Sequence, residues 1–260
     1  MSDNPKWYDS VWLAAYYAAK DVVAKVAPAR LEEFVRSFDV LRTSPDFSAQ
    51  HLPQVIDPPL LGHIRDVIRA IPRDKYELHE MQSFGRFIVH DYPEITALQA
   101  TLVDKVSEWA GEAVEPSYNF LSLYTRLGVC EPHLDSPSAK WTLDICVDQS
   151  DPWPIQFSQI VPWPEQRPLL ADAWRDEIKA NGSLQFRSLA LHPGDAILFS
   201  GSSQWHYRNP LPRDGVKRFC DLLFLHFIPR GARQIVTPAN WPVLFDIPEL
   251  AEIPNLDRAM

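Results

Sequence analysis

The feature that most constrains the fold is a change of hydrophobic period near Ser117. Before this residue, apolar side chains recur at helical intervals, whereas after it short β-branched and aromatic stretches alternate with clusters of Gly, Pro, Asp and Ser. Helices followed by a run of short strands favour an α+β domain with a β-sandwich or jelly-roll core. We predict a single domain over residues 1–260, with a mainly helical support region over 1–115, a jelly-roll core over 116–228 and an extension over 229–260.

The pattern also predicts individual elements. Helices are expected over residues 7–26, 28–35, 60–71 and 93–110, with a loop over 45–58 and a partly extended segment over 76–90. Strands are expected over residues 117–126, 140–147, 153–159, 184–191, 196–200, 204–208 and 218–227.

Composition argues against several kinds of partner. The formal net charge is −9, whereas a nucleic-acid-binding surface needs concentrated Lys and Arg. No apolar stretch approaches the roughly 18 residues of a membrane span, and the N-terminus lacks the pattern of a signal peptide. Cys130, Cys146 and Cys220 show no paired or zinc-ligand spacing and are expected to be core thiols. We therefore expect a cytoplasmic protein with neither a membrane nor a nucleic-acid partner, and the oligomeric state stays open.

Two histidines and one carboxylate form a candidate metal site. His133 and Asp135 lie two residues apart, so on an extended segment both side chains point to the same side. His206 belongs to a later strand, which we expect on the opposing side of the barrel mouth. Three such ligands hold one face of a non-haem iron and leave positions open for a bidentate 2-oxo acid and oxygen. Each residue also has an ordinary structural explanation, as a turn cap, a loop carboxylate or a strand histidine.

The residues around this trio form an ordered set of motifs. They are Tyr124-Thr-Arg-Leu-Gly128 leading into Glu131-Pro-His133-Leu-Asp135, then Pro193-Gly194-Asp195-Ala-Ile-Leu-Phe199, and finally His206 followed by Gly215-Val-Lys-Arg218. In this order they resemble the iron(II)/2-oxoglutarate-dependent dioxygenases, particularly the prolyl-hydroxylase-like branch. The resemblance covers roughly residues 118–227. It implies a double-stranded β-helix core of the cupin-like jelly-roll type. We expect the N-terminal helical region, which lies outside the resemblance, to pack on this core. The resemblance also implies Fe(II), the cosubstrate 2-oxoglutarate and O2.

The resemblance further implies a basic residue that pairs with the distal carboxylate of 2-oxoglutarate. Lys217 and Arg218 both stand near the start of the last core strand. Arg218 shares the strand face of Cys220, Leu222 and Phe224, which is the better barrel interior. A guanidinium also binds a carboxylate through two parallel hydrogen bonds. We therefore assign Arg218 to this role, with Lys217 as the alternative.

Other residues are candidates for contacts in the same pocket. Tyr124 is expected to donate a hydroxyl hydrogen bond to the cosubstrate, or else to be a core aromatic residue. Arg126 shares the strand parity of Tyr124, and Arg208 shares that of His206, so both are possible contacts for a substrate carboxylate, as is Arg86. The alternative for Arg126 is an exposed charge at the edge of the barrel. Trp205, next to a ligand, is a candidate for shaping the pocket.

These observations lead to a functional hypothesis. The chain is interpreted as an Fe(II)/2-oxoglutarate-dependent oxygenase that hydroxylates or desaturates an unactivated C–H bond of a small, amino-acid-like molecule. Halogenating relatives replace the ligand carboxylate by a small residue, and this chain keeps Asp135. The alternatives are a hydroxylase of a peptidyl residue, a cupin-like metal enzyme that does not use 2-oxoglutarate, and a binding or sensing protein without turnover.

Overall fold

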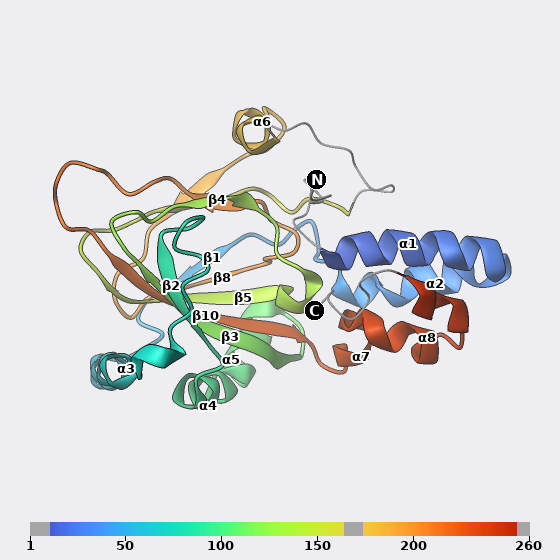
Figure 1. Cartoon of the computed structure of the whole chain (residues 1–260), viewed down its shortest axis with the longest axis horizontal. Coiled ribbons are helices and arrows are strands. Elements are labelled where there is room, and N and C mark those ends of the chain that lie inside the picture. Colours follow the sequence, from blue (N-terminus) through green and yellow to red (C-terminus); the bar gives the residue numbers. More distant parts are fainter. Residues whose placement is uncertain (1–10, 164–173, 254–260) are drawn as a thin grey trace.

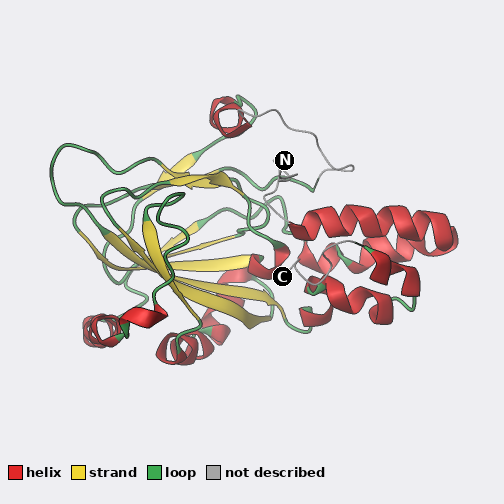
Figure 2. Ribbon diagram, viewed as in Figure 1, coloured by secondary structure: helices red, strands yellow, loops and turns green. Residues whose placement is uncertain are grey.

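The computed structural model describes residues 11–163 and 174–253, and two antiparallel sheets form its centre (Figures 1 and 2). The large sheet has the strand order β1-β8-β5-β10-β3-β2. Its strands are β1 (Gln50–Leu52), β2 (Arg86–His90), β3 (Val114–Tyr124), β5 (Trp141–Gln149), β8 (Ala196–Phe199) and β10 (Cys220–Pro229). The small sheet has the order β4-β9-β6-β7. Its strands are β4 (Cys130–His133), β6 (Ile155–Phe157), β7 (Arg187–Leu189) and β9 (His206–Arg208).

Strand alternation divides the side chains of the large sheet between two environments. In β3, β5 and β10, odd-numbered residues such as Leu121 and Leu223 pack into an apolar cluster beneath helices, whereas even-numbered residues such as Leu222 belong to a separate cluster on the other face. In β8 the parity is reversed, with Leu198 in the first cluster and Ile197 in the second. The covering helices are α3 (Pro58–Ala70), α4 (Pro93–Thr101) and α5 (Val103–Ala110), which lie below the sheet in Figure 1. The helices therefore close one face of the large sheet and leave the other to face the small sheet.

A second group of helices lies beside the sheets. It consists of α1 (Val11–Val26), α2 (Leu31–Ser37), α7 (Arg233–Val236) and α8 (Trp241–Leu244), with short 3-10 turns between them. Trp12 is buried at its centre, where its indole nitrogen donates a hydrogen bond to the carbonyl of Val236 at 2.8 Å. Its ring contacts those of Phe38, Trp163 and Trp241. A separate helix, α6 (Trp174–Ala180), contacts β4 of the small sheet.

Most expected elements are present, with some differences. The helix expected over 93–110 is divided into α4 and α5 at Leu102, and it ends as expected at Gly111, whose φ of 71° suits a helix C-terminus. The loop expected over 45–58 contains the short edge strand β1, which pairs with β8. All three cysteines are buried and free, as expected of core thiols. Residues 7–10 of the first expected helix lie outside the described ranges.

The helical first third is not a single layer. Its helices α1 and α2 join the C-terminal helices in one aromatic core, whereas α3, α4 and α5 pack on the large sheet. No helix within residues 11–163 and 174–253 has the length and apolar character that a bilayer crossing demands.

Candidate metal centre and its cavity

The structure brings His133, Asp135 and His206 together. One ligand atom from each lies within 4.8 Å of the other two. His133 ends β4 and His206 begins β9, and the two are direct partners in the antiparallel pairing of these strands. The expectation that His206 lies on the opposing side of the barrel mouth is therefore wrong: both histidines belong to adjacent strands of the small sheet. Cross-strand neighbours have their Cβ atoms about 5 Å apart, which suits two ligands of one ion.

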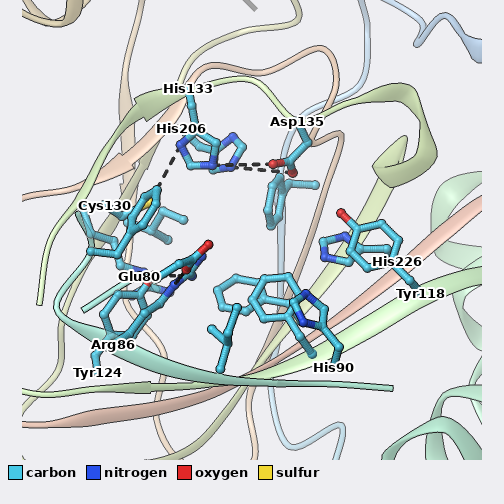
Figure 3. A pocket seen from close by; sticks show the side chains of 17 residues that line it. Glu80, Arg86, His90, Tyr118, Tyr124, Cys130, His133, Asp135, His206 and His226 are labelled. Carbon is cyan, nitrogen blue, oxygen red and sulfur yellow. Dashed lines mark hydrogen bonds and ion pairs between the residues drawn. The ribbon is translucent and has the colours of Figure 1, made fainter. Parts of the chain in front are cut away.

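Backbone carbonyls fix the orientation of both imidazoles. The Nδ1 atom of His133 lies 2.8 Å from the carbonyl oxygen of Glu131, and that of His206 lies 2.9 Å from the carbonyl oxygen of Gln204. Each Nδ1 therefore carries the proton and donates it, which leaves the lone pair on Nε2. These two Nε2 atoms lie 3.5 and 3.8 Å from the carboxylate oxygens of Asp135. The three lone-pair donors thus converge on one point (Figure 3).

A glycine makes room for the carboxylate. The backbone nitrogen of Asp135 donates to the carbonyl of Gly201 at 2.9 Å. A Cβ atom on residue 201 would lie 2.2 Å from the Asp135 carboxylate and 2.8 Å from the carbonyl oxygen of Ala139. No side chain fits there without moving the ligand. The role of Gly201 is not visible in the sequence, because a close approach between two loops leaves no pattern in the spacing of residues.

The electrostatics of the site keep Asp135 ionised and His206 neutral. Burial opposes the charge of Asp135, but the neighbouring His206 and His133 hold the pKa of this carboxyl well below its usual range. Burial and the nearby His133 lower the pKa of His206 to about 4. Burial opposes the protonation of His133, but the neighbouring Cys130 and Asp135 outweigh it and hold the pKa of this imidazole well above its usual value. At neutral pH the site therefore offers an ionised carboxylate and a neutral His206.

A cavity of about 270 Å³ lies between the two sheets in front of these ligands. Its lining comes from the large sheet, the small sheet and the segment before β2. In Figure 3, Arg86, Tyr124 and Cys130 lie on one side of the cavity, while Asp135, Tyr118 and His226 lie on the other. The lining residues are Glu80, Phe84, Arg86, Ile88, His90, Tyr118, Phe120, Tyr124, Cys130, His133, Asp135, Ile155, Phe199, His206, Arg208, Phe224 and His226.

Two arginines line the cavity, and each already has a carboxylate partner. Arg208 is 2 % exposed and donates to Asp144 at 2.6 Å, as well as to the carbonyl oxygen of Trp153. Arg86 forms an ion pair with Glu80 and donates to the hydroxyl of Tyr124 at 2.8 Å. Since Tyr124 accepts this bond, its own hydroxyl proton is available to another acceptor in the cavity.

The other predicted contacts lie outside the cavity lining. Arg218 precedes β10 in an exposed loop, forms ion pairs with Asp151 and Asp214, and its side chain is 17 % exposed. Lys217 beside it is exposed. Strand alternation predicted that Arg218 points into the barrel. The prediction does not apply, because β10 begins only at Cys220 and Arg218 precedes it.

The remaining two candidates have ordinary structural positions. Arg126 is exposed in the turn that follows β3, since this strand ends at Tyr124. Trp205 is fully buried on the opposite face of its strand from His206, in the aromatic core that also contains Leu134. Neither lines the cavity in front of the ligands.

Several lining residues were not assigned to the pocket from the sequence. Cys130 faces the cavity although it stands three residues before His133, because the register of β4 shifts between them. Tyr118 and Phe120 share the parity of Tyr124, which is the signal that identifies them. Glu80 comes from the segment before β2, and no periodic pattern marks it.

Comparisons with known proteins identify the architecture. No protein-family model matches the chain, and no curated protein does. Among solved structures, HygX from Streptomyces hygroscopicus, with nickel, 2-oxoglutarate and hygromycin B bound, is 10 % identical. That match covers 76 % of this chain and 86 % of HygX, with a TM-score of 0.52.

Two further structures agree with this match. The non-haem α-ketoglutarate-dependent carbocyclase SnoK from nogalamycin biosynthesis is 11 % identical over 72 % of this chain and 83 % of SnoK, with a TM-score of 0.53. EctD from S. alaskensis, with 2-oxoglutarate and 5-hydroxyectoine, is 13 % identical over 70 % of this chain and 72 % of EctD, with a TM-score of 0.50. At these identities the likeness concerns the fold, and the chain has the fold of the iron(II)/2-oxoglutarate oxygenases.

Proposed function

We propose that this protein is an iron(II)/2-oxoglutarate-dependent oxygenase in which His133, Asp135 and His206 bind the iron. The observation that carries the proposal is the convergence of two tethered imidazole nitrogens and one carboxylate within 4.8 Å. Two imidazoles and a carboxylate on one face form the donor set that suits Fe(II) with open positions. Bound iron supplies the chemistry that couples oxidative decarboxylation of 2-oxoglutarate to oxidation of a substrate C–H bond.

The strand order supports a jelly-roll core of the double-stranded β-helix type. The four strands β8-β5-β10-β3 lie consecutively in the large sheet, and β4-β9-β6-β7 form the small sheet. Successive strands from β3 to β10 thus alternate between the two sheets, except that β6 and β7 follow one another as a pair within the small sheet. This is the winding of such a core. The ligands of the small sheet then face the large sheet across the cavity.

We place the distal carboxylate of 2-oxoglutarate at Arg86 and Tyr124, with Arg208 behind them. Arg86 is the more available arginine, because its partner Glu80 is partly exposed and can turn towards water when a ligand carboxylate takes its place. Asp144, the partner of Arg208, is fully buried and cannot turn towards water, so Arg208 stays paired with it. This assignment replaces Arg218, whose guanidinium is held by two carboxylates outside the lining.

The substrate is proposed to be a small molecule with a carboxylate or similar polar group, such as an amino-acid derivative. A cavity of about 270 Å³ lies just below the usual range of ligand pockets, about 300–1,000 Å³. HygX and EctD were solved with the small molecules hygromycin B and 5-hydroxyectoine, respectively. Because the ligand carboxylate Asp135 is present, we propose hydroxylation or desaturation rather than halogenation.

Anaerobic spectroscopy tests the metal site. Addition of Fe(II) and 2-oxoglutarate to the full chain is expected to give a weak visible charge-transfer band, and addition of oxygen is expected to yield succinate. His133→Ala should abolish both signals, whereas His63→Ala, on the exposed surface of α3, should leave them unchanged. A folded, iron-loaded protein without the band and without succinate would refute the proposal.

A comparison of arginine variants tests the cosubstrate site. We expect Arg86→Gln to raise the KM for 2-oxoglutarate at least tenfold, since a charged hydrogen bond contributes about 1.5–3 kcal/mol. Arg218→Gln is the matched control and should change this KM by less than about twofold, a difference of roughly 0.4 kcal/mol. Both KM values are measured from steady-state succinate formation. A raised KM in Arg218→Gln together with an unchanged KM in Arg86→Gln would assign the cosubstrate carboxylate to Arg218 instead.

A further inference from the structure

We propose that Tyr118 and His226 form a subsite that binds an uncharged hydroxyl or carbonyl group on an apolar, ring-like part of the substrate. The inference rests on the proposed oxygenase function, which it extends to substrate recognition. The two residues lie side by side in the cavity, on its Asp135 side and away from Arg86 and Tyr124 (Figure 3). They therefore face the metal ligands from the side that the cosubstrate site leaves free.

An irregularity in the large sheet presents these two side chains. The pairing of β3 and β10 shifts between Leu225 and Phe227, so that two residues of β3, Ser117 and Tyr118, stand opposite the single residue His226. Such bulges re-aim side chains and are over-represented next to active sites. The shift thus occurs where both aromatic residues reach the cavity.

The buried side chain of Gln99 stabilises the irregular pairing of β3 and β10. The side-chain amide of Gln99 donates to the carbonyl oxygens of Tyr118 at 3.0 Å and His226 at 2.7 Å. The side chain of Asn119 donates to the Oε1 atom of Gln99 at 2.9 Å, which fixes the direction of its amide. One buried side chain therefore holds the backbone of both subsite residues.

His226 has a polar atom with no partner in the described part of the chain. Its side chain is 3 % exposed, and its Nδ1 atom lies 2.9 Å from the hydroxyl of Thr142. Its Nε2 atom, on the opposite edge of the ring, is buried and makes no hydrogen bond with any described residue. A buried polar atom left unpaired costs about 1–3 kcal/mol, and a ligand in the cavity lined by this ring can provide the missing partner.

Aromatic rings surround this atom and indicate the rest of the ligand. The ring of Tyr118 stacks on that of His226 at 4.2 Å, and the ring of Phe120 lies 5.5 Å away. Phe224, stacked on Phe120 at 4.9 Å, continues the aromatic surface along the same sheet. These faces favour a flat or apolar group in van der Waals contact.

The charge state of the histidine fits a neutral ligand group. Burial lowers the pKa of His226 to about 4, so the imidazole is uncharged at neutral pH. A neutral imidazole hydrogen-bonds a hydroxyl or a carbonyl without a charge to balance, whereas a carboxylate finds Arg86 on the opposite side of the cavity. The two sides of the cavity therefore recognise different chemical groups.

Fragment binding tests the subsite without knowledge of the natural substrate. Benzyl alcohol carries the ring and the hydroxyl, and toluene is its counterpart without the hydroxyl. NMR titration of the full chain, both metal-free and loaded with zinc(II) and 2-oxoglutarate, is expected to show about tenfold tighter binding of benzyl alcohol, with a shift of the His226 side-chain nitrogen signals. Equal affinities, no binding of benzyl alcohol, or shifts confined to other residues would overturn the proposal.

Two variants remove, one at a time, the hydroxyl of Tyr118 and the imidazole nitrogens of His226. Tyr118→Phe and His226→Phe keep the aromatic surface and should each reduce the preference for benzyl alcohol to less than about threefold, which is roughly 0.6 kcal/mol. His63→Phe, on the exposed face of α3, should retain the tenfold preference. If His226→Phe does not fold because Thr142 loses its partner, the double variant Thr142→Val/His226→Phe replaces it. A preference retained in the Tyr118 and His226 variants would overturn the proposal.

Turnover separates this subsite from the cosubstrate site. In both variants, succinate formation stimulated by compounds of a metabolite library should fall at least tenfold, which exceeds any change in the KM for 2-oxoglutarate, whereas the surface variant His63→Phe should change neither quantity. A raised KM for 2-oxoglutarate would instead assign His226 to the cosubstrate. Failure of the oxygenase proposal would appear separately, as absent decarboxylation in the wild-type protein.

Discussion

At the scale of single residues, the three side chains of the candidate metal site were predictable and the backbone groups that position them were not. His133, Asp135 and His206 carry a recognisable pattern of residue types. Gly201 and the carbonyl oxygens that orient the imidazoles act through the backbone, and any residue type supplies a carbonyl. Groups that require a particular side chain are therefore visible in the sequence, whereas backbone groups that require only a particular position in the fold are not.

Gly201→Ala tests the support of the carboxylate. The added methyl group would lie 2.2 Å from a carboxylate oxygen of Asp135, so the ligand must move. We expect the affinity for Fe(II), titrated anaerobically through the 2-oxoglutarate charge-transfer band, to fall at least tenfold, or about 1.4 kcal/mol. Gly62→Ala, in α3 with open space around the site, is the control and should leave this affinity unchanged.

The raised pKa of Asp221 is expected to make the stability of the fold depend on pH. Burial and the nearby Asp148 raise the pKa of Asp221 to about 7, against the opposing effect of Arg65. The folded protein thus binds this proton more tightly than the unfolded chain, whose Asp pKa is about 3.9. The contribution of this residue to stability is present below pH 4 and is lost as the pH rises to about 7.

Asp221→Asn should remove this loss. Because the site is partly exposed, we expect a gain in unfolding free energy of about 2 kcal/mol at pH 8, shrinking towards zero below pH 4. Urea unfolding at several pH values measures the difference. A gain that is equal at all pH values would show that ionisation of Asp221 is not its cause.

At the scale of elements, strand parity succeeded inside strands and failed beyond their ends. It placed Arg208 with His206 correctly, because both lie within β9. It failed for Arg126 and Arg218, which lie just outside β3 and β10. The failures follow from strand boundaries, which local composition defines poorly and hydrogen bonding between distant segments decides.

Gln99 offers a test at this scale, since it links α4 to the irregular pairing of β3 and β10. Gln99→Met keeps the volume but removes the hydrogen bonds to the carbonyl oxygens of Tyr118 and His226. We expect a loss of about 3 kcal/mol in unfolding free energy, because two buried acceptors lose their partner. Gln185→Met, at an exposed position, should change stability by less than about 0.5 kcal/mol. Denaturant unfolding measures both variants.

At the scale of the whole molecule, the change of hydrophobic period predicted a mixed helix-and-sheet protein, and this is confirmed. The division of 260 residues into support region, core and extension stays a prediction. The sequence did not show that α1 and the C-terminal helices share one aromatic core. Contacts between residues so far apart depend on the finished fold and leave no periodic pattern.

Trp12 tests the importance of this shared core. Its ring is 1 % exposed and its indole nitrogen is bonded to Val236. Trp12→Ala should reduce the unfolding free energy by about 3–5 kcal/mol through the cavity that it creates. Val243→Ala, at a position 88 % exposed, should have an effect of less than about 0.5 kcal/mol. Thermal and denaturant unfolding report the difference.

The bond between Trp12 and Val236 also has a consequence for the order of folding. The two residues are 224 positions apart, so α1 leaves the ribosome long before the segment that buries its aromatic ring. During synthesis the apolar face of this helix stays exposed until the C-terminal segment is available. Exposed apolar surface of this kind is bound by chaperones and promotes aggregation in competition with folding. The packing of α1 is therefore completed only after the C-terminal segment around Val236 has been synthesised.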